Sequence, residues 1–148
     1  MGKAHQLREA GIIKRFVYAG NSKFTLVSKK TGIRFTFRIR KKADQDFWFV
    51  SLLNGPDNEN NFAYIGYIHS LRDGGRILRH GGAKSRAGFE SPSWKAFQWF
   101  WNVLDGERGD LLERLEFWHE GKCGRCSRPL TVPSSILSGF GPECQKYL

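Results

Sequence analysis

The sequence predicts an α+β fold in which an antiparallel sheet of about five strands packs on an aromatic helix, followed by a short helix and a C-terminal zinc knuckle. Three observations predict it. Apolar and polar residues alternate in the N-terminal half, which is typical of half-buried strands, whereas apolar residues after Ser91 recur at helical spacing. All three cysteines of the chain lie after residue 122, with the spacing of metal ligands.

The clearest strands form a predicted hairpin. Residues 24–28 and 33–40 alternate in polarity, and Gly32 between them allows a turn. Because side chains alternate between the two faces of a strand, one face of the second strand is apolar and the other cationic. The apolar face carries Ile33, Phe35, Phe37 and Ile39, and the other carries Arg34, Thr36, Arg38 and Arg40. We expect further strands at residues 12–19, 47–53, 62–70 and 76–80.

Two helices are expected after the strands. Ser91 is a suitable N-cap with Pro92 in the first turn, and a stripe at helical spacing follows. Its members are Trp94, Phe97, Phe100, Trp101, Val103 and Leu104, and their core spacing favours packing on the sheet over stacking on nucleic-acid bases. Trp99 lies off this stripe, so we expect it near the surface. Asp110 and Glu113 form a capping box for a second helix that ends at Gly121.

The chain divides into two parts that are expected to pack as one unit. Residues 1–107 form a basic α+β part, and residues 108–148 carry the second helix and the metal module. A chain of 148 residues with 40% apolar and 14% aromatic residues can bury a core. Its apolar runs are shorter than the roughly 20 residues of a membrane helix, and Met1–Gln6 lacks the apolar region of a signal peptide. Because cysteines in metal-ligand register suit a reducing compartment, we expect a cytoplasmic protein. Since the helices follow most of the strands, we expect an open sheet rather than a small barrel.

The cysteines predict a structural zinc site. Cys123 and Cys126 are separated by two residues, a spacing that lets a tight turn direct both sulfurs at one ion, and Cys144 follows a glycine-rich return of the chain. His119 is the best fourth ligand, because the predicted helix places it on the same face as Leu112 and Leu115. Such a Cys3His site has no vacant position and supports structure rather than chemistry. The alternatives are a redox pair, a disulfide with a spare thiol, or three unrelated cysteines.

The segment from Cys123 to Cys144, with the sequence CGRCSRPLTVPSSILSGFGPEC, resembles the C-terminal zinc module of functionally uncharacterised proteins of bacteriophages and bacteria. A weaker similarity to phage proteins extends through residues 55–60 and 91–97. Ser127 stands where that family more often has glycine. The resemblance implies a phage origin, a bound metal and a place in the host bacterial cytoplasm, and it implies no activity.

The positive charge is concentrated at the N-terminus. The chain has a formal net charge of +10, and residues 1–46 hold twelve Lys or Arg against three acids. This asymmetry is typical of a surface that binds a polyanion, although a solubilising face is the plainer interpretation. The nucleic-acid contacts that we predict are Lys29, Lys30, Arg34, Arg38, Arg40, Lys41, Lys42, Arg125 and Arg128, with Tyr64, Tyr67 or Trp48 as stacking partners.

Three functions follow from these features. The first is a non-enzymatic, zinc-binding accessory protein that binds single-stranded DNA or RNA through the basic sheet face. The second is a phage-encoded inhibitor that binds a bacterial defence complex, as anti-CRISPR proteins do. The third is a metal-dependent nuclease using Asp44, Asp46, Asp57 and Glu59. However, Asp and Asn are common in turns because their side chains hydrogen-bond to the nearby backbone. These four acids also form no recognisable two-metal motif.

Overall fold

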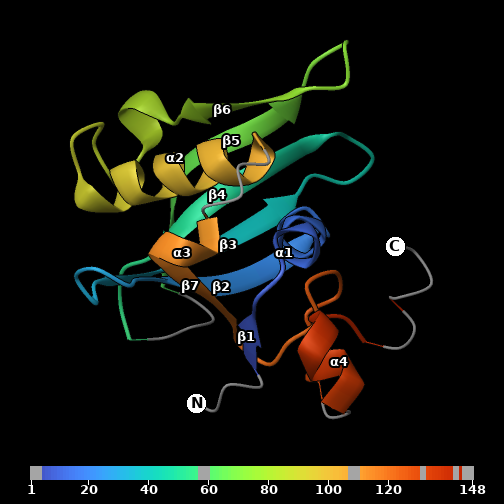
Figure 1. Cartoon of the computed structure of the whole chain (residues 1–148). Helices are drawn as coiled ribbons and strands as arrows, with labels where there is room; N and C mark the ends of the chain where they lie inside the picture. Colours follow the sequence, from blue (N-terminus) through green and yellow to red (C-terminus); the bar gives the residue numbers. More distant parts are fainter. Residues whose placement is uncertain (1–4, 57–60, 107–110, 131–132, 142–143, 145–148) are drawn as a thin grey trace.

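A computed structural model describes residues 5–56, 61–106, 111–130, 133–141 and 144 (Figure 1). Its centre is one antiparallel sheet of seven strands, in the order β1-β7-β2-β3-β4-β5-β6. The strands are β1 (Gln6–Leu7), β2 (Asn21–Ser28), β3 (Arg34–Lys41), β4 (Phe47–Leu53), β5 (Phe62–Ser70), β6 (Arg76–His80) and β7 (Leu115–His119). The sheet has β1 and β6 as edges, so it is open and has two strands more than predicted.

The predicted hairpin is confirmed as β2 and β3, with Phe24 opposite Phe37. Phe37 and Ile39 are fully buried, whereas Arg34 and Arg40 are exposed, as the alternation predicted. The predicted strands at 47–53, 62–70 and 76–80 are also confirmed, as β4, β5 and β6. Strands β2 to β6 form a meander in which each strand pairs with the next.

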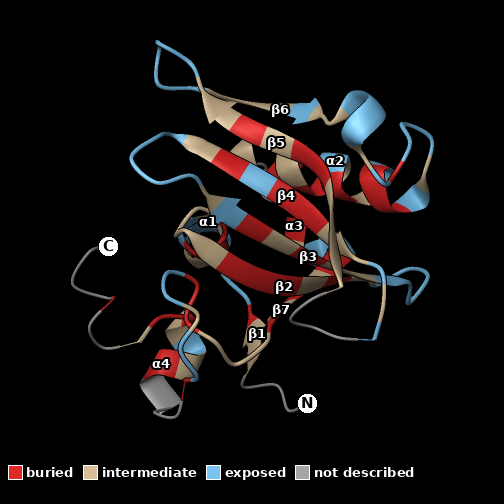
Figure 2. Cartoon of the chain, turned by 180° about the vertical axis from the view of Figure 1, so that it is seen from behind, coloured by how far each residue is buried: buried red, intermediate tan, exposed pale blue. Residues whose placement is uncertain are grey.

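The helices gather on one face of the sheet. They are α1 (Ala10–Val17), α2 (Pro92–Asp105) and α3 (Leu111–Arg114), while α4 (Pro133–Ser138) belongs to the C-terminal region and the short 3-10 helix η2 (Gly82–Lys84) follows β6. Figure 2 shows the sheet from the other side, where no helix of the described chain lies across it. We call the helix-bearing side the covered face and the other the open face.

The aromatic stripe of α2 forms the core with the covered face, as predicted. Ser91 caps the helix, its hydroxyl accepting from the backbone N–H of Trp94 at 3.4 Å. The Phe97 ring centre lies 5.0 Å from that of Phe37, and Phe100 lies 5.7 Å from Phe24. These rings are fully buried, so the core sits between α2 and the middle strands.

The strand predicted at residues 12–19 is wrong, because this segment forms α1. Its buried residues are Ile13, Phe16 and Val17, a spacing that places them on one side of a helix but on both sides of a strand. Lys14 and Arg15 in its last turn also suit the negative end of a helix dipole.

The predicted helix through His119 is also wrong beyond its first turn. It ends at Arg114 as α3, and Leu115–His119 continues as β7 with alternating burial. Glu116 and Trp118 face away from the core, while Leu115, Phe117 and His119 face into it. Asp110 lies outside the described residues, so the predicted capping box cannot be placed.

Strand β7 joins the two parts of the chain. It lies between β1 and β2, and the Phe117 ring stacks on Phe24 with centres 4.7 Å apart. The segment after residue 108 therefore supplies an internal strand of the sheet as well as the cysteines. None of the helices in the described parts combines the length and apolarity that a membrane crossing requires.

Candidate metal centre and candidate nucleic-acid interface

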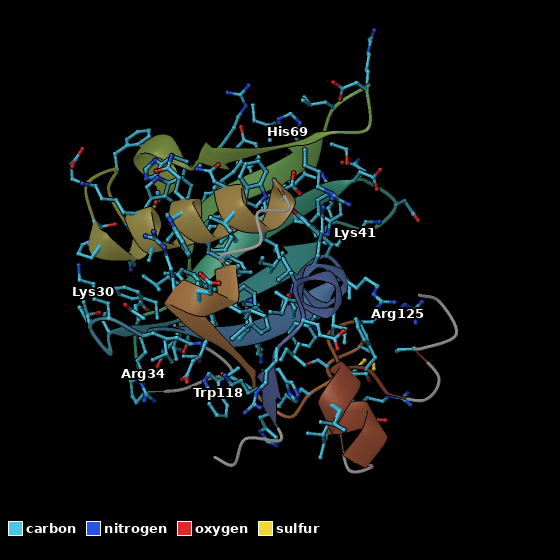
Figure 3. All side chains as sticks on the ribbon, viewed as in Figure 1. Lys30, Arg34, Lys41, His69, Trp118 and Arg125 are labelled. Atoms are coloured by element: carbon cyan, nitrogen blue, oxygen red, sulfur yellow. The ribbon has the colours of Figure 1, made fainter. Side chains whose placement is uncertain are left out.

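The three cysteines converge although they are far apart in sequence. The sulfurs of Cys123, Cys126 and Cys144 all lie within 4.8 Å of one another, and Figure 3 shows them beside the labelled Arg125. Cys123 and Cys144 are buried and Cys126 is exposed. A tetrahedral ion with metal–sulfur bonds of about 2.3 Å places its sulfurs about 3.8 Å apart, so small movements would close the cluster around an ion. The three residues could therefore hold a metal ion.

A tight turn aims the first two sulfurs. An isolated bridge pairs Lys122 with Pro129, and inside it the Ser127 N–H donates to the Cys123 carbonyl at 2.8 Å. Ser127 adopts a positive φ of 65°, a conformation that glycine takes without strain. The Arg125 backbone N–H points at the Cys123 sulfur at 3.4 Å, which favours a thiolate there.

The cysteines differ in acidity. Burial raises the pKa of Cys123, but hydrogen bonds from the backbone of Gly141, Cys126 and Arg125 outweigh burial and leave the pKa below its ordinary value. Burial raises the pKa of Cys144 to about 11, although the Arg125 guanidinium, 3.7 Å from the sulfur, opposes the shift. A bound cation would favour the thiolate form of both.

We call the cysteine-bearing segment from Gly121 to Cys144 the knuckle. Phe16 of α1 attaches it to the sheet. A Cβ added at Gly124 would lie 2.6 Å from the Phe16 ring, and one at Gly139 would lie 2.7 Å from it. The Phe140 ring centre is 6.0 Å away in an edge-on contact. Backbone bonds complete the attachment, since the Asn21 N–H donates to the Gly124 carbonyl at 2.9 Å. The two glycines are thus required by close packing.

His119 does not join the cysteines, contrary to the predicted Cys3His set. It is fully buried on β7, where its Nδ1 accepts from the Gly121 N–H at 2.9 Å and its Nε2 lies 2.6 Å from the Ile136 carbonyl. Both ring nitrogens are therefore occupied, with the proton on Nε2. Burial lowers the pKa of His119, and the nearby His5, whose ring stacks on it at 5.1 Å, lowers it further. The hydrogen bond from His119 to Ile136 therefore links β7 to α4, and we call this link the His119 clasp. Within the described chain, no other Cys, His, Asp or Glu completes the cysteine group.

The open face carries a row of aromatic rings on β4 and β5. Phe47 stacks on Tyr67 with ring centres 4.9 Å apart, and Phe49 lies edge-on to Tyr64 at 6.2 Å. His69 continues the row, stacked against Tyr67 at 6.1 Å. Phe49 is 38% exposed, although large apolar side chains are usually buried. We call these five residues the aromatic row.

Cations flank the aromatic row on both sides. Arg34, Arg38 and Arg40 project from β3 on the open face, as predicted. Arg40 lies opposite Phe49 and Arg79 on β6 lies opposite Tyr67, whereas Arg34 stands at the other end of β3, before its first pair with β4. Arg34, Arg40 and Arg79 are exposed, whereas the Arg38 guanidinium packs on the Phe62 ring at 4.8 Å. Glu116 on β7 is an acid of this face, and it accepts from the Trp118 indole N–H at 3.2 Å.

The other predicted contacts lie elsewhere. Lys29 and Lys30 are at the β2–β3 turn, where the Lys29 Nζ donates to the Leu112 carbonyl at 2.6 Å. Lys41 is the last residue of β3 and Lys42 begins the β3–β4 turn, and the Lys41 Nζ lies 3.9 Å from an Asp46 carboxylate oxygen. The exposed Arg125 and Arg128 lie in the turn between Lys122 and Pro129 that also holds Cys123 and Cys126. The structure brings together only the three arginines of β3.

Sequence reasoning missed several residues of this face. Phe47, Phe49, His69 and Arg79 were not selected, although the alternation of β4, β5 and β6 places them in phase with Tyr67. Trp48 was selected but is 4% exposed, with its indole N–H donating to the Tyr18 carbonyl at 3.2 Å. The period-two rule applied to β4 would have exchanged Trp48 for its neighbours.

The carboxylates considered for a nuclease form no site in the described part of the chain. Asp44 and Asp46 are exposed on the β3–β4 turn, and Asp44 has a positive φ of 59°, which Asp tolerates better than most residues. Asp57 and Glu59 lie outside the described residues. Among the residues described, the three cysteines are the group that could bind a metal.

Comparison with protein families matches residues 114–148 to a family of unknown function, DUF6011. The matched segment contains β7, the clasp residue His119 and all three cysteines. Comparisons with curated proteins and with solved structures give no match. The similarity thus concerns the C-terminal region and implies no particular activity.

Proposed function

We propose that this chain is a non-enzymatic accessory protein that binds single-stranded DNA or RNA on the open face of its sheet. Its phage-like motif and the metal-ligand spacing of its cysteines fit a role in the cytoplasm of an infected bacterium. The observation that carries the proposal is the aromatic row, in which Phe49 is 38% exposed and over which no described helix lies (Figure 2), with Arg40 on one side and Arg79 on the other.

The chemistry of the aromatic row suits unpaired bases. Every base has a π face, so stacking on an aromatic side chain contributes about 1–3 kcal/mol per base and tolerates any sequence. The bases of a duplex are already stacked and do not offer these faces. Phe49 and Tyr67 are therefore the residues that we propose to stack on bases.

The arginines supply the sequence-independent part of the affinity. Arg34 and Arg40 are exposed and bind phosphates in this proposal, releasing counterions as they do so. Arg38 packs on the Phe62 ring, so in this proposal it stabilises the surface rather than binding phosphate. Phosphate contacts position a strand without reading its bases, so we propose binding with little sequence preference.

The cysteine cluster has a structural role in this proposal. The donor set of three sulfurs suits Zn²⁺, which prefers thiolate ligands in tetrahedral sites. A zinc ion there would fix the knuckle against α1 and, through the His119 clasp, hold β7 in the sheet.

The test is fluorescence anisotropy with labelled oligo-dT at several salt concentrations. Joint replacement Arg34→Ala and Arg40→Ala removes two phosphate contacts, so the slope of log affinity against log salt should flatten by about 1.4. The matched control is Arg15→Ala with Lys95→Ala, which removes two exposed cations from the helices of the covered face. The proposal fails if wild-type protein does not bind at low salt, or if both double variants change the slope equally.

A further inference from the structure

A groove opens on the covered side of the sheet, away from the aromatic row. It lies between the β2–β3 turn, the first half of α2 and α3, and it has a volume of about 760 Å³. That size is within the range of about 300–1,000 Å³ that is usual for ligand sites. The labelled Lys30 marks its mouth in Figure 3. Its apolar walls are Leu26, Ile33, Phe35, Ala96, Trp99 and Leu115.

The groove leaves apolar side chains accessible. Ile33 is 56% exposed just before β3, and Trp99 is only half-buried, whereas Trp94, Phe97 and Phe100 of the same helix are buried. Trp99 lies off the apolar stripe of α2, and its side chain instead lines the groove. An accessible apolar concavity rimmed by polar residues is typical of a binding site.

The mouth of the groove is cationic. Lys29 and Lys30 stand on the turn, Lys95 on α2 and Arg114 on α3, against the single lining acid Glu113. Lys29 is tied to α3 through the Leu112 carbonyl, while Lys95 lies 2.8 Å from the exposed carboxylate of Glu90. Because exposed ion pairs are weak, Lys95 can exchange this partner for another carboxylate.

We propose that this groove binds an acidic segment of a partner protein that carries a large apolar side chain. The apolar side chain sits against Ile33, Phe35 and Trp99, and flanking carboxylates meet Lys30 and Lys95. The cations come from three elements around the mouth, so several separated negative charges fit them better than one. Charge complementarity at such a rim increases the association rate and selects the partner. Since the open face is on the other side of the sheet, the chain can hold a nucleic acid and this partner together.

The test uses a labelled heptapeptide of five aspartates around two adjacent phenylalanines, with anisotropy as the readout. Wild-type protein should bind it, and the double reversal Lys30→Glu with Lys95→Glu should weaken binding by about tenfold or more, since each attraction becomes a repulsion. Ile33→Asp should weaken it by about tenfold, because it places a charge on the apolar wall. Leu71→Asp is the matched control, since Leu71 is 43% exposed on the β5–β6 turn outside the groove. Binding of oligo-dT should be unchanged by Ile33→Asp, which separates this proposal from the one for the open face.

Three results would overturn the proposal. The first is no peptide binding at low salt, or equal weakening by Ile33→Asp and Leu71→Asp. The second is binding of dodecanoate without binding of the peptide, which would assign the groove to a fatty acid. The third is self-association of the protein that Ile33→Asp abolishes, which would assign the groove to a second copy of the chain.

Discussion

The sheet and the C-terminal knuckle are held together by different means. The sheet rests on large rings, such as Phe24, Phe37 and Phe97, that are fully buried against α2. In the described part of the knuckle the buried apolar side chains are few, Leu130 and Phe140 among them. The Phe16 contact and the His119 clasp attach it, and its three sulfurs could hold a metal ion. Apolar burial needs no ligand, whereas a cysteine cluster reaches its full stability only with an ion. The difference implies that the two faces proposed to bind partners persist when the knuckle loosens.

The largest expected effect is on the sheet. Phe97→Ala removes a fully buried ring, so it should lower the free energy of unfolding by about 3–5 kcal/mol. Phe49→Ala is its matched control, because this ring is 38% exposed on the open face and its loss should cost less than about 1 kcal/mol. Urea denaturation measures both. Equal costs would show that the covered face is not the core.

The next effect concerns the metal. Purified protein should carry about one zinc per chain, and Cys144→Ser should lose most of it because a thiolate ligand is gone. His119→Gln should keep the zinc, since both imidazole nitrogens are already hydrogen-bonded within the chain. Metal content measured by mass spectrometry under reducing conditions decides this. If His119→Gln loses as much zinc as Cys144→Ser while its circular dichroism stays native, the histidine is a ligand after all.

Packing against Phe16 should give an intermediate effect. Gly124→Ala places a Cβ 2.6 Å from the Phe16 ring, and such overpacking costs about 1–3 kcal/mol. Hydrogen exchange should show faster exchange at residues 121–130 and unchanged protection in β3 and β4. Gly88→Ala is the control, since a Cβ there meets nothing within 4 Å. Loss of protection throughout the sheet would mean that knuckle and sheet unfold as one unit.

The smallest effect is expected at the polar cluster where α1 meets α2. The Tyr18 hydroxyl donates to Asp105 at 2.9 Å and accepts from the Trp101 indole N–H at 2.9 Å. Burial, with Asp105 as the second cause, holds the pKa of Tyr18 well above its usual range. Tyr18→Phe removes both bonds and should lower stability by about 1–2 kcal/mol in thermal unfolding. A change below about 0.3 kcal/mol would show that this cluster does not stabilise the fold.

Local patterns were enough to predict most of the meander and α2. The alternation at residues 33–40 and the capped stripe from Ser91 each identify one element without reference to the rest of the chain. The cysteine spacing likewise predicted a cluster that the structure assembles.

Long-range pairing explains what the sequence did not reveal. Leu112, Leu115 and His119 fit a helix, but pairing with β2 extends the segment from Leu115 into a strand and turns His119 toward Ile136. The two strands that were missed, β1 and β7, pair with each other across almost the whole length of the chain. Such pairing depends on tertiary contacts, which override local propensity.

The most direct test of binding by the open face is photo-crosslinking of oligo-dT to the wild-type protein, followed by mass spectrometry of the linked peptides. Our account predicts crosslinks at Phe49 and Tyr67, with crosslinking reduced when both are replaced by alanine. Crosslinks confined to α2 or to the knuckle, with none on β4 or β5, would contradict it.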